Sequence, residues 1–211
     1  YSFYLHSDDR TDIAAMATIS TISQPLRGEF IRTAATAGAV VYQVDARLPA
    51  LIPVFFAGQL SAVRLCAVMA LVSGTWSSLT GLPDEPENGE AALPVSPETE
   101  YQRRRYTLTL QNGRSGERVE SVLTEASSRL RGDLLRNLII TGLALHTTAP
   151  ELPRLLASMP VPPTSVSELQ ALVQQMAGTA DVNRAAAAVP DTPAASAAPV
   201  SGADTRATKT N

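Results

Sequence analysis

The stretch "SVLTEASSRLRGDLLRNLIITGLAL", residues 121–145, combines a leucine-rich face with a charged face. The apolar residues recur at helical spacing, and charged residues occupy the other side: Leu123, Leu130, Leu134, Leu138 and Leu145 against Arg129, Arg131, Asp133 and Arg136. Gly132 and Gly142 weaken this helix locally by about 1 kcal/mol each relative to alanine. The pattern predicts one helix over 121–145 that lies at the centre of the core.

A second apolar segment, "GQLSAVRLCAVMALVSGTWSSLT", covers residues 58–80. A helix that is apolar on all sides is typical of a buried position. We therefore expect a helix at 60–73 to pack against the leucine-rich one. Pro49 and Pro53 interrupt the apolar run before Arg64, and the stretch after Arg64 is shorter than the ~20 residues that a membrane span needs. No membrane span is predicted.

Three further helices are predicted from their capping residues. Ser7, Asp8 and Asp9 suit the positive N-terminal end of a helix, and Ser165 with Glu168 forms a capping box. Gly178 is a typical C-terminal stop. The predicted helices cover 7–23, the segment from 148 to the prolines at 160–163, and 165–178.

Strand signals lie between these helices. The segment 38–49, "GAVVYQVDARLP", is β-branched and alternates, and 51–56 is a second candidate strand. Residues 104–120 alternate around Asn112-Gly113, which predicts a β-hairpin. The predicted fold class is therefore α+β: a mostly helical body with a β-hairpin and one or two further strands, followed by an extended C-terminal tail.

The chain divides by composition into a body at 1–178 and a tail at 179–211 that is rich in Ala, Pro and Thr. Within the body, residues 82–100 contain six acidic residues, four prolines and no basic residue, which predicts an exposed acidic loop. We expect the tail to run extended along other subunits, because its alanines bury too little surface to order it alone. Its candidate interaction residues are Pro190, Pro193 and Pro199.

Composition argues against catalysis. The chain has sixteen arginines, one lysine (Lys209) and one cysteine (Cys66). A body without lysine excludes a Schiff-base or Walker-type lysine, and a single cysteine excludes an internal disulfide or a multi-cysteine metal site. His6 is followed by Ser7, Asp8 and Asp9, but neighbours in sequence rarely point at one another as a triad requires. We predict no catalytic, cofactor-binding or metal-binding residue, and no enzyme activity.

Two features remain as candidate interaction sites. Arg103, Arg104 and Arg105 form the one basic cluster, which suits RNA phosphates, an acidic partner or simple balance of the acidic loop. A net charge of −3 does not favour nucleic-acid binding, which needs clustered basic residues, so nucleic acid is not an expected partner. Trp76, at the end of the apolar helix, is predicted to fill the core or an interface.

An arginine-rich, lysine-poor body that ends in an Ala/Pro/Thr-rich tail resembles the coat proteins of fungal double-stranded RNA viruses, particularly the totivirus-like ones. The resemblance implies a non-enzymatic capsid or capsid-surface protein, present in many copies in a virion that assembles in the host cytoplasm. Its partners would be further copies or a larger shell protein. The alternative interpretation is a soluble cytoplasmic adaptor or binding module with a disordered tail.

Overall fold

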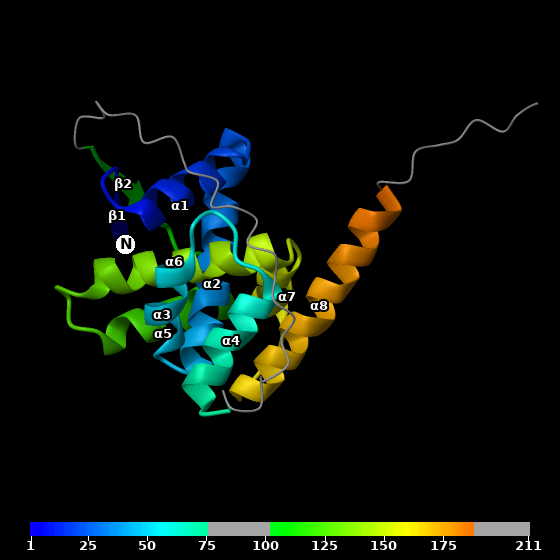
Figure 1. Ribbon diagram of the computed structural model, residues 1–211. Helices are drawn as coiled ribbons and strands as arrows, with labels where there is room; N and C mark the ends of the chain where they lie inside the picture. Colours follow the sequence, from blue (N-terminus) through cyan, green and yellow to red (C-terminus); the bar gives the residue numbers. More distant parts are fainter. Residues whose placement is uncertain (76–101, 188–211) are drawn as a thin grey trace, which may run out of the picture.

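The computed structural model describes residues 1–75 and 102–187, in which eight α-helices surround a core and two strands form a small sheet (Figure 1). This arrangement confirms the mostly helical α+β class. In chain order the elements are β1 (Ser2–His6), α1 (Arg10–Ser20), the 3₁₀ turn η1 (Gln24–Leu26), α2 (Arg27–Val44), α3 (Leu48–Phe55), α4 (Ala62–Ser73), β2 (Arg103–Thr107), α5 (Arg114–Glu125), α6 (Arg131–Thr148), α7 (Leu152–Ser158) and α8 (Val166–Ala187).

Helices α2 and α6 form the centre of the fold and cross at close range (Figure 1). Gly38 of α2 lies against the backbone of Leu138, and Gly142 of α6 lies against the backbone of Ala34. Neither glycine has room for a Cβ atom, so the two backbones touch directly. The central place of the leucine-rich helix is confirmed, but its main partner is α2. The expected partner, α4, packs on α3 and α8 instead.

The predicted strands at 38–49 and 51–56 are wrong, because these residues belong to α2 and α3. Val40 and Val41 are fully buried on α2, where packing outweighs their β-propensity. Pro49 suits the first turn of α3, where the missing N–H would have no helical partner. The interior Pro53 is tolerated in this short helix, and its carbonyl accepts from the Thr11 hydroxyl at 3.1 Å.

The predicted single helix at 121–145 is two helices with a turn at 126–130. Ala126 is extended, and Arg131 Nε donates to the carbonyls of Leu123 and Ala126 at 3.0 and 3.2 Å. The guanidinium thereby satisfies carbonyls that the end of α5 leaves open. The predicted hairpin at 104–120 is also wrong in its second half, since the residues after Gly113 start α5. Gly113 does take the positive φ, 135°, that its sequence signal indicated.

The capping predictions for α1 and α8 hold at their N-terminal ends, whereas the helix predicted from residue 148 begins only at Leu152, because Thr148 ends α6 and Glu151 precedes α7 without a side-chain cap. Asp9 Oδ1 accepts from the N–H of Asp12, and Ser165 Oγ accepts from the N–H of Glu168. Helix α8 does not stop at Gly178 but continues to Ala187, since one glycine costs only about 1 kcal/mol in a helix. The division into a body and a tail stays a prediction, and residues 188–211 lie outside the described part of the chain.

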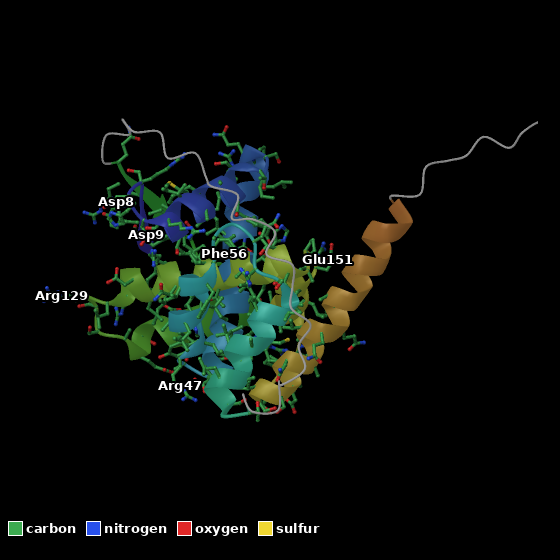
Figure 2. All side chains as sticks on the ribbon, in the orientation of Figure 1. Asp8, Asp9, Arg47, Phe56, Arg129 and Glu151 are labelled. Carbon is green, nitrogen blue, oxygen red and sulfur yellow. The ribbon has the colours of Figure 1, made fainter. Side chains whose placement is uncertain are left out.

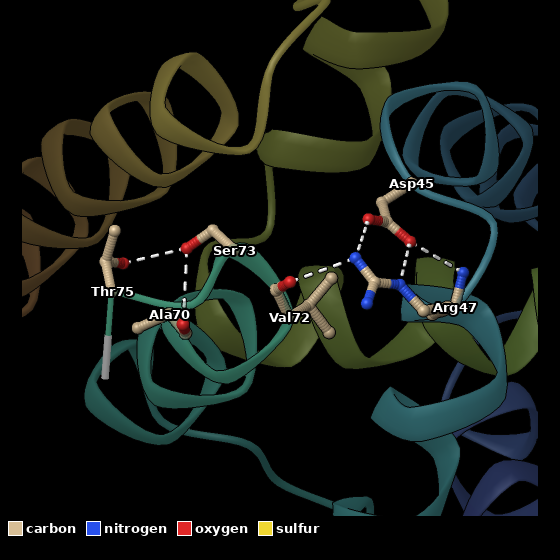
Figure 3. Close-up of polar contacts among 6 residues, drawn as sticks. All are labelled: Asp45, Arg47, Ala70, Val72, Ser73 and Thr75. Carbon is tan, nitrogen blue, oxygen red and sulfur yellow. Dashed lines mark hydrogen bonds and ion pairs between the residues drawn. The ribbon is translucent and has the colours of Figure 1, made fainter. Parts of the chain in front are cut away.

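An arginine clamp joins the end of α2 to the end of α4 (Figure 3). Arg47 donates through Nε and Nη2 to the two carboxylate oxygens of Asp45 at 3.0 and 2.7 Å, and through Nη2 to the carbonyl of Val72 at 2.9 Å. The hydrogen bonds from Arg47 lower the pKa of Asp45 below its ordinary value. The clamp thus ties two chain turns together through one exposed guanidinium.

Replacing Asp45 with asparagine should lower the free energy of unfolding by about 0.5 kcal/mol near pH 7, the size expected of an exposed ion pair. Because the pKa of Asp45 is lower in the folded chain than the ~3.9 of an unfolded one, the carboxylate stabilises the fold above that pH. This stabilisation is lost as the pH falls through the folded pKa. Urea unfolding of both proteins at pH 7 and at pH 2.5 checks this. An equal gap at both pH values would contradict it.

Candidate interaction surface at the strand pair

The first strand, β1, agrees with the alternation of apolar and polar residues in "SFYLH". No strand was predicted for this segment. Phe3 and Leu5 are fully buried and face the core beside α6. Ser2, Tyr4 and His6 are half-buried and lie on the outer face. The period of two over residues 2–6 is the sequence signal that predicts this strand.

The partner strand, β2, contains the arginine cluster. It pairs antiparallel with β1, with Tyr4 opposite Arg105 and His6 opposite Arg103. Side chains alternate across a strand, so Arg103 and Arg105 share the outer face with Tyr4, whereas Arg104 points to the other face. Of the predicted cluster, Arg103 and Arg105 therefore form one surface, and Arg104 lies on the opposite face of the sheet.

A ring pair joins the two strands on the face of the sheet that is turned to the core. Phe3 and Tyr106 stack with ring centroids 5.2 Å apart and an interplanar angle of 15°. Burial raises the pKa of the Tyr106 phenol, while the nearby guanidinium groups of Arg104 and Arg27 act in the opposite direction. Arg27, at the start of α2, therefore adds a fourth cation near this sheet.

Each arginine of β2 is exposed and held by an uncharged group. The Arg103 guanidinium lies 3.5 Å from the centroid of the Tyr4 ring, and Arg104 lies 5.4 Å from the Tyr106 ring centroid. Arg105 Nη2 donates to Ser2 Oγ at 3.1 Å. Within residues 1–75 and 102–187 none of the three forms an ion pair. Among the described residues, no carboxylate neutralises these three charges.

A buried carboxylate locks the strand pair to the helices. Asp12 is 1% exposed, and its Oδ1 accepts from Arg136 Nε at 2.6 Å while Oδ2 accepts from the N–H of His6 at 2.9 Å. Arg136 also approaches Asp9 at 3.3 Å. Burial raises the pKa of Asp12, and the hydrogen bonds from His6 and Arg136 offset part of that rise. This contact holds β1, α1 and α6 in fixed relative positions.

A hollow of about 490 Å³ lies at the Arg103 end of the sheet. Its lining mixes both signs of charge, with carboxylates in the majority: Tyr4, His6, Arg103, Asp8, Asp9 and Asp133 are among its residues. Figure 2 shows Asp8 and Asp9 beside the strand pair. An approaching polyanion would meet these carboxylates next to Arg103.

Several side chains of the types that catalytic sites use make local contacts. Ser7 Oγ accepts from the N–H of Gln102 at 2.8 Å, and Asp9 caps α1. Ser115 of the "GRSG" segment donates to the carbonyl of Ala157 at 3.2 Å. His146 Nδ1 lies 3.1 Å from the carbonyl of Pro150, with its ring edge-on to Phe30. These contacts bring no nucleophile to a base among the described residues.

No three His, Cys, Asp or Glu side chains in 1–75 and 102–187 gather in a way that could hold a metal ion. No helix in the same ranges is long and apolar enough to cross a membrane. The acidic loop at 82–100 and the candidate residues Trp76, Pro190, Pro193 and Pro199 lie outside the described part of the chain.

A family model described as "plasmid stability protein" matches residues 1–69 and 104–173, about two thirds of the chain. The chain belongs to the plasmid stability protein family. The match includes β1, the crossing helices α2 and α6, and residues 104–107 of β2. No curated protein and no solved structure matches the chain.

Membership of the plasmid stability family corrects the resemblance to coat proteins. The predicted capsid role, the virion location and the viral family are wrong. The resemblance depended on tail composition and on arginine usage, whereas the family match ends at residue 173, before the tail begins. Composition alone does not separate unrelated chains that share an Ala/Pro/Thr-rich tail.

The part of the chain that the family model matches differs in net charge from the whole chain. The two matched ranges contain thirteen arginines and eleven acidic residues, so this part of the chain is slightly basic. The unmatched range 70–103 includes the acidic segment 82–100. The overall charge of −3 therefore does not describe the matched part of this plasmid stability protein, which includes Arg104 and Arg105.

Proposed function

We propose that this chain is a non-enzymatic binding module that supports plasmid maintenance by holding another protein. The observation that carries the proposal is the exposed set of Arg103, Arg104 and Arg105 on a paired strand, without ion-pair partners in the described residues. Arginine and tyrosine are enriched where proteins bind one another, and the Tyr4 ring holds one guanidinium in place. Family membership supports the cellular role.

The proposal assigns no cofactor and no turnover to the chain, and it places the protein in the cytoplasm with the plasmid. Supporting this, the described Ser7, Ser115 and His146 side chains are engaged in local hydrogen bonds. A binding module needs only a rigid surface, which the locked strand pair supplies. The adaptor interpretation, which was the alternative at the level of the sequence, therefore becomes the proposed function.

Plasmid retention tests this role. In growing cells without selection, an Arg103→Gln/Arg104→Gln/Arg105→Gln variant should lose the plasmid at a rate approaching that of a deletion of the gene. The matched control, Arg64→Gln/Arg114→Gln/Arg129→Gln, removes the same charge from exposed positions elsewhere and should retain the plasmid. Protein levels are compared by immunoblot. Normal retention in the β2 variant would contradict the proposal.

A further inference from the structure

The free edge of β2 follows from the hydrogen bonds at the two ends of the sheet. The backbones of Tyr1 and Leu108 exchange both of their hydrogen bonds, at 3.1 and 2.9 Å. At the other end, the N–H of Ser7 donates to the carbonyl of Gln102 at 3.0 Å. Bonded and non-bonded pairs alternate along antiparallel strands. Even-numbered β2 residues therefore bond toward β1.

The odd-numbered residues of β2, which are Arg103, Arg105 and Thr107, consequently direct their backbone N–H and C=O groups away from β1. No hydrogen bond from another described element reaches these groups. The outer edge of β1 is engaged at His6, whose N–H donates to Asp12 of α1 and whose carbonyl accepts from the N–H of Asp9. In the described part of the chain, the outer edge of β2 has no such contact.

We propose, building on the proposed function, that an acidic extended segment of a partner protein adds to this open edge as a third strand. Its backbone would bond to Arg103, Arg105 and Thr107, whose outward groups include both donors and acceptors. Carboxylates at alternate positions of the added strand would meet the Arg103 and Arg105 side chains on the outer face. Main-chain bonds supply affinity and alternate side chains supply specificity in this mode of recognition.

Charge selects the occupant of this edge. A second copy of the chain would place arginines opposite arginines, and like charges across a strand pair are unfavourable. Duplex DNA would meet Asp8, Asp9 and Asp133 around the hollow beside Arg103. Its phosphates also offer only acceptors, whereas the open edge presents carbonyls that need donors. An acidic protein strand satisfies both the charges and the backbone.

Fluorescence anisotropy with the full chain and a labelled eight-residue peptide of alternating Glu and Thr tests the side-chain part. Arg103→Gln/Arg105→Gln should weaken binding by about tenfold or more, because two charge-assisted contacts are lost. The control Arg114→Gln/Arg129→Gln removes two charges from exposed positions outside β2 and should change affinity by less than about threefold. Equal loss in both variants, or no binding at millimolar peptide, would overturn the proposal.

Backbone chemistry separates strand addition from simple attraction of charges. Methylating one alternate set of peptide nitrogens should abolish binding, and methylating the other set should preserve it, because only one edge of the added strand faces β2. Thr107→Pro removes one outward N–H but leaves the bonds to β1 intact. We expect it to weaken binding with an unchanged melting curve. Equal binding of both methylated peptides overturns strand addition.

The two proposals fail in different ways. Tighter binding of a 20-base-pair duplex than of the peptide, lost in Arg103→Gln/Arg105→Gln, would overturn the acidic strand in favour of DNA. If the β2 variant loses the plasmid but binds the peptide like the wild type, the strand inference is wrong and the proposed function stands. If a β2 arginine variant loses peptide binding but retains the plasmid normally, the proposed function is overturned instead.

Discussion

Gly142→Ala should lower the free energy of unfolding by about 3 kcal/mol, the upper part of the usual range for overpacking a core. The added Cβ would lie on the backbone of Ala34, which is part of helix α2 and has no rotamer with which to move aside. This value of about 3 kcal/mol already includes the opposing gain of about 1 kcal/mol that alanine brings relative to glycine in a helix. Relief requires α2 and α6 to separate along their whole contact.

The double variant Gly38→Ala/Gly142→Ala should be the most damaging change described for this chain. Its two clashes fall on the same helix crossing, and at about 3 kcal/mol each their sum lies near the lower end of the ~5–15 kcal/mol that stabilises a typical domain. Urea unfolding followed by circular dichroism measures both variants. The control is Gly178→Ala in α8, where a Cβ meets nothing and stability should rise by about 1 kcal/mol. A wild-type midpoint for Gly142→Ala would show that the helices do not touch here.

Asp12→Ala should cost about 3 kcal/mol, because removing one partner of a buried ion pair leaves the other uncompensated. Arg136 would keep only its longer contact to Asp9 at 3.3 Å and its hydrogen bond to Asn137 at 3.2 Å. The N–H of His6 would lose its acceptor at the same time. Thermal and urea unfolding measure the loss, which should exceed that of Asp45→Asn severalfold.

The pH dependence of this site has the opposite sign to that of Asp45. Because burial raises the pKa of Asp12 above the ~3.9 of the unfolded chain, the folded protein binds the proton more readily. The stability that preferential protonation of folded Asp12 contributes is complete below pH ~3.9 and is lost as the pH rises through the folded pKa, while the ion pair with Arg136 offsets part of the cost of burying the ionised form. Asp12→Asn should cost less than Asp12→Ala and should lack this slope. If the difference in unfolding free energy between the wild type and the Asp12→Asn variant is constant from pH 3 to pH 7, the assignment is refuted.

Part of the candidate surface can be predicted from the sequence, and the rest depends on the tertiary structure. The run of Arg103, Arg104 and Arg105 is visible in the sequence, and so is the alternation in residues 2–6. The strand with which β2 pairs is not visible in the sequence, because it lies about a hundred residues away and a local hairpin fits the same pattern. The open edge and the position of Arg103 over Tyr4 exist only once the two segments pair.

The sequence by itself determined the properties that depend on neighbours within one turn or cap. These are the mostly helical α+β class, the starts of α1 and α8 at their capping residues, and the burial of the leucine-rich face of α6. Only the tertiary structure decided the state of residues 38–44, where β-branched side chains favour a strand in isolation. The contact of Gly38 with α6 buries Val40 and Val41 in a helix, and this burial is worth more than the ~1 kcal/mol span of β-propensity.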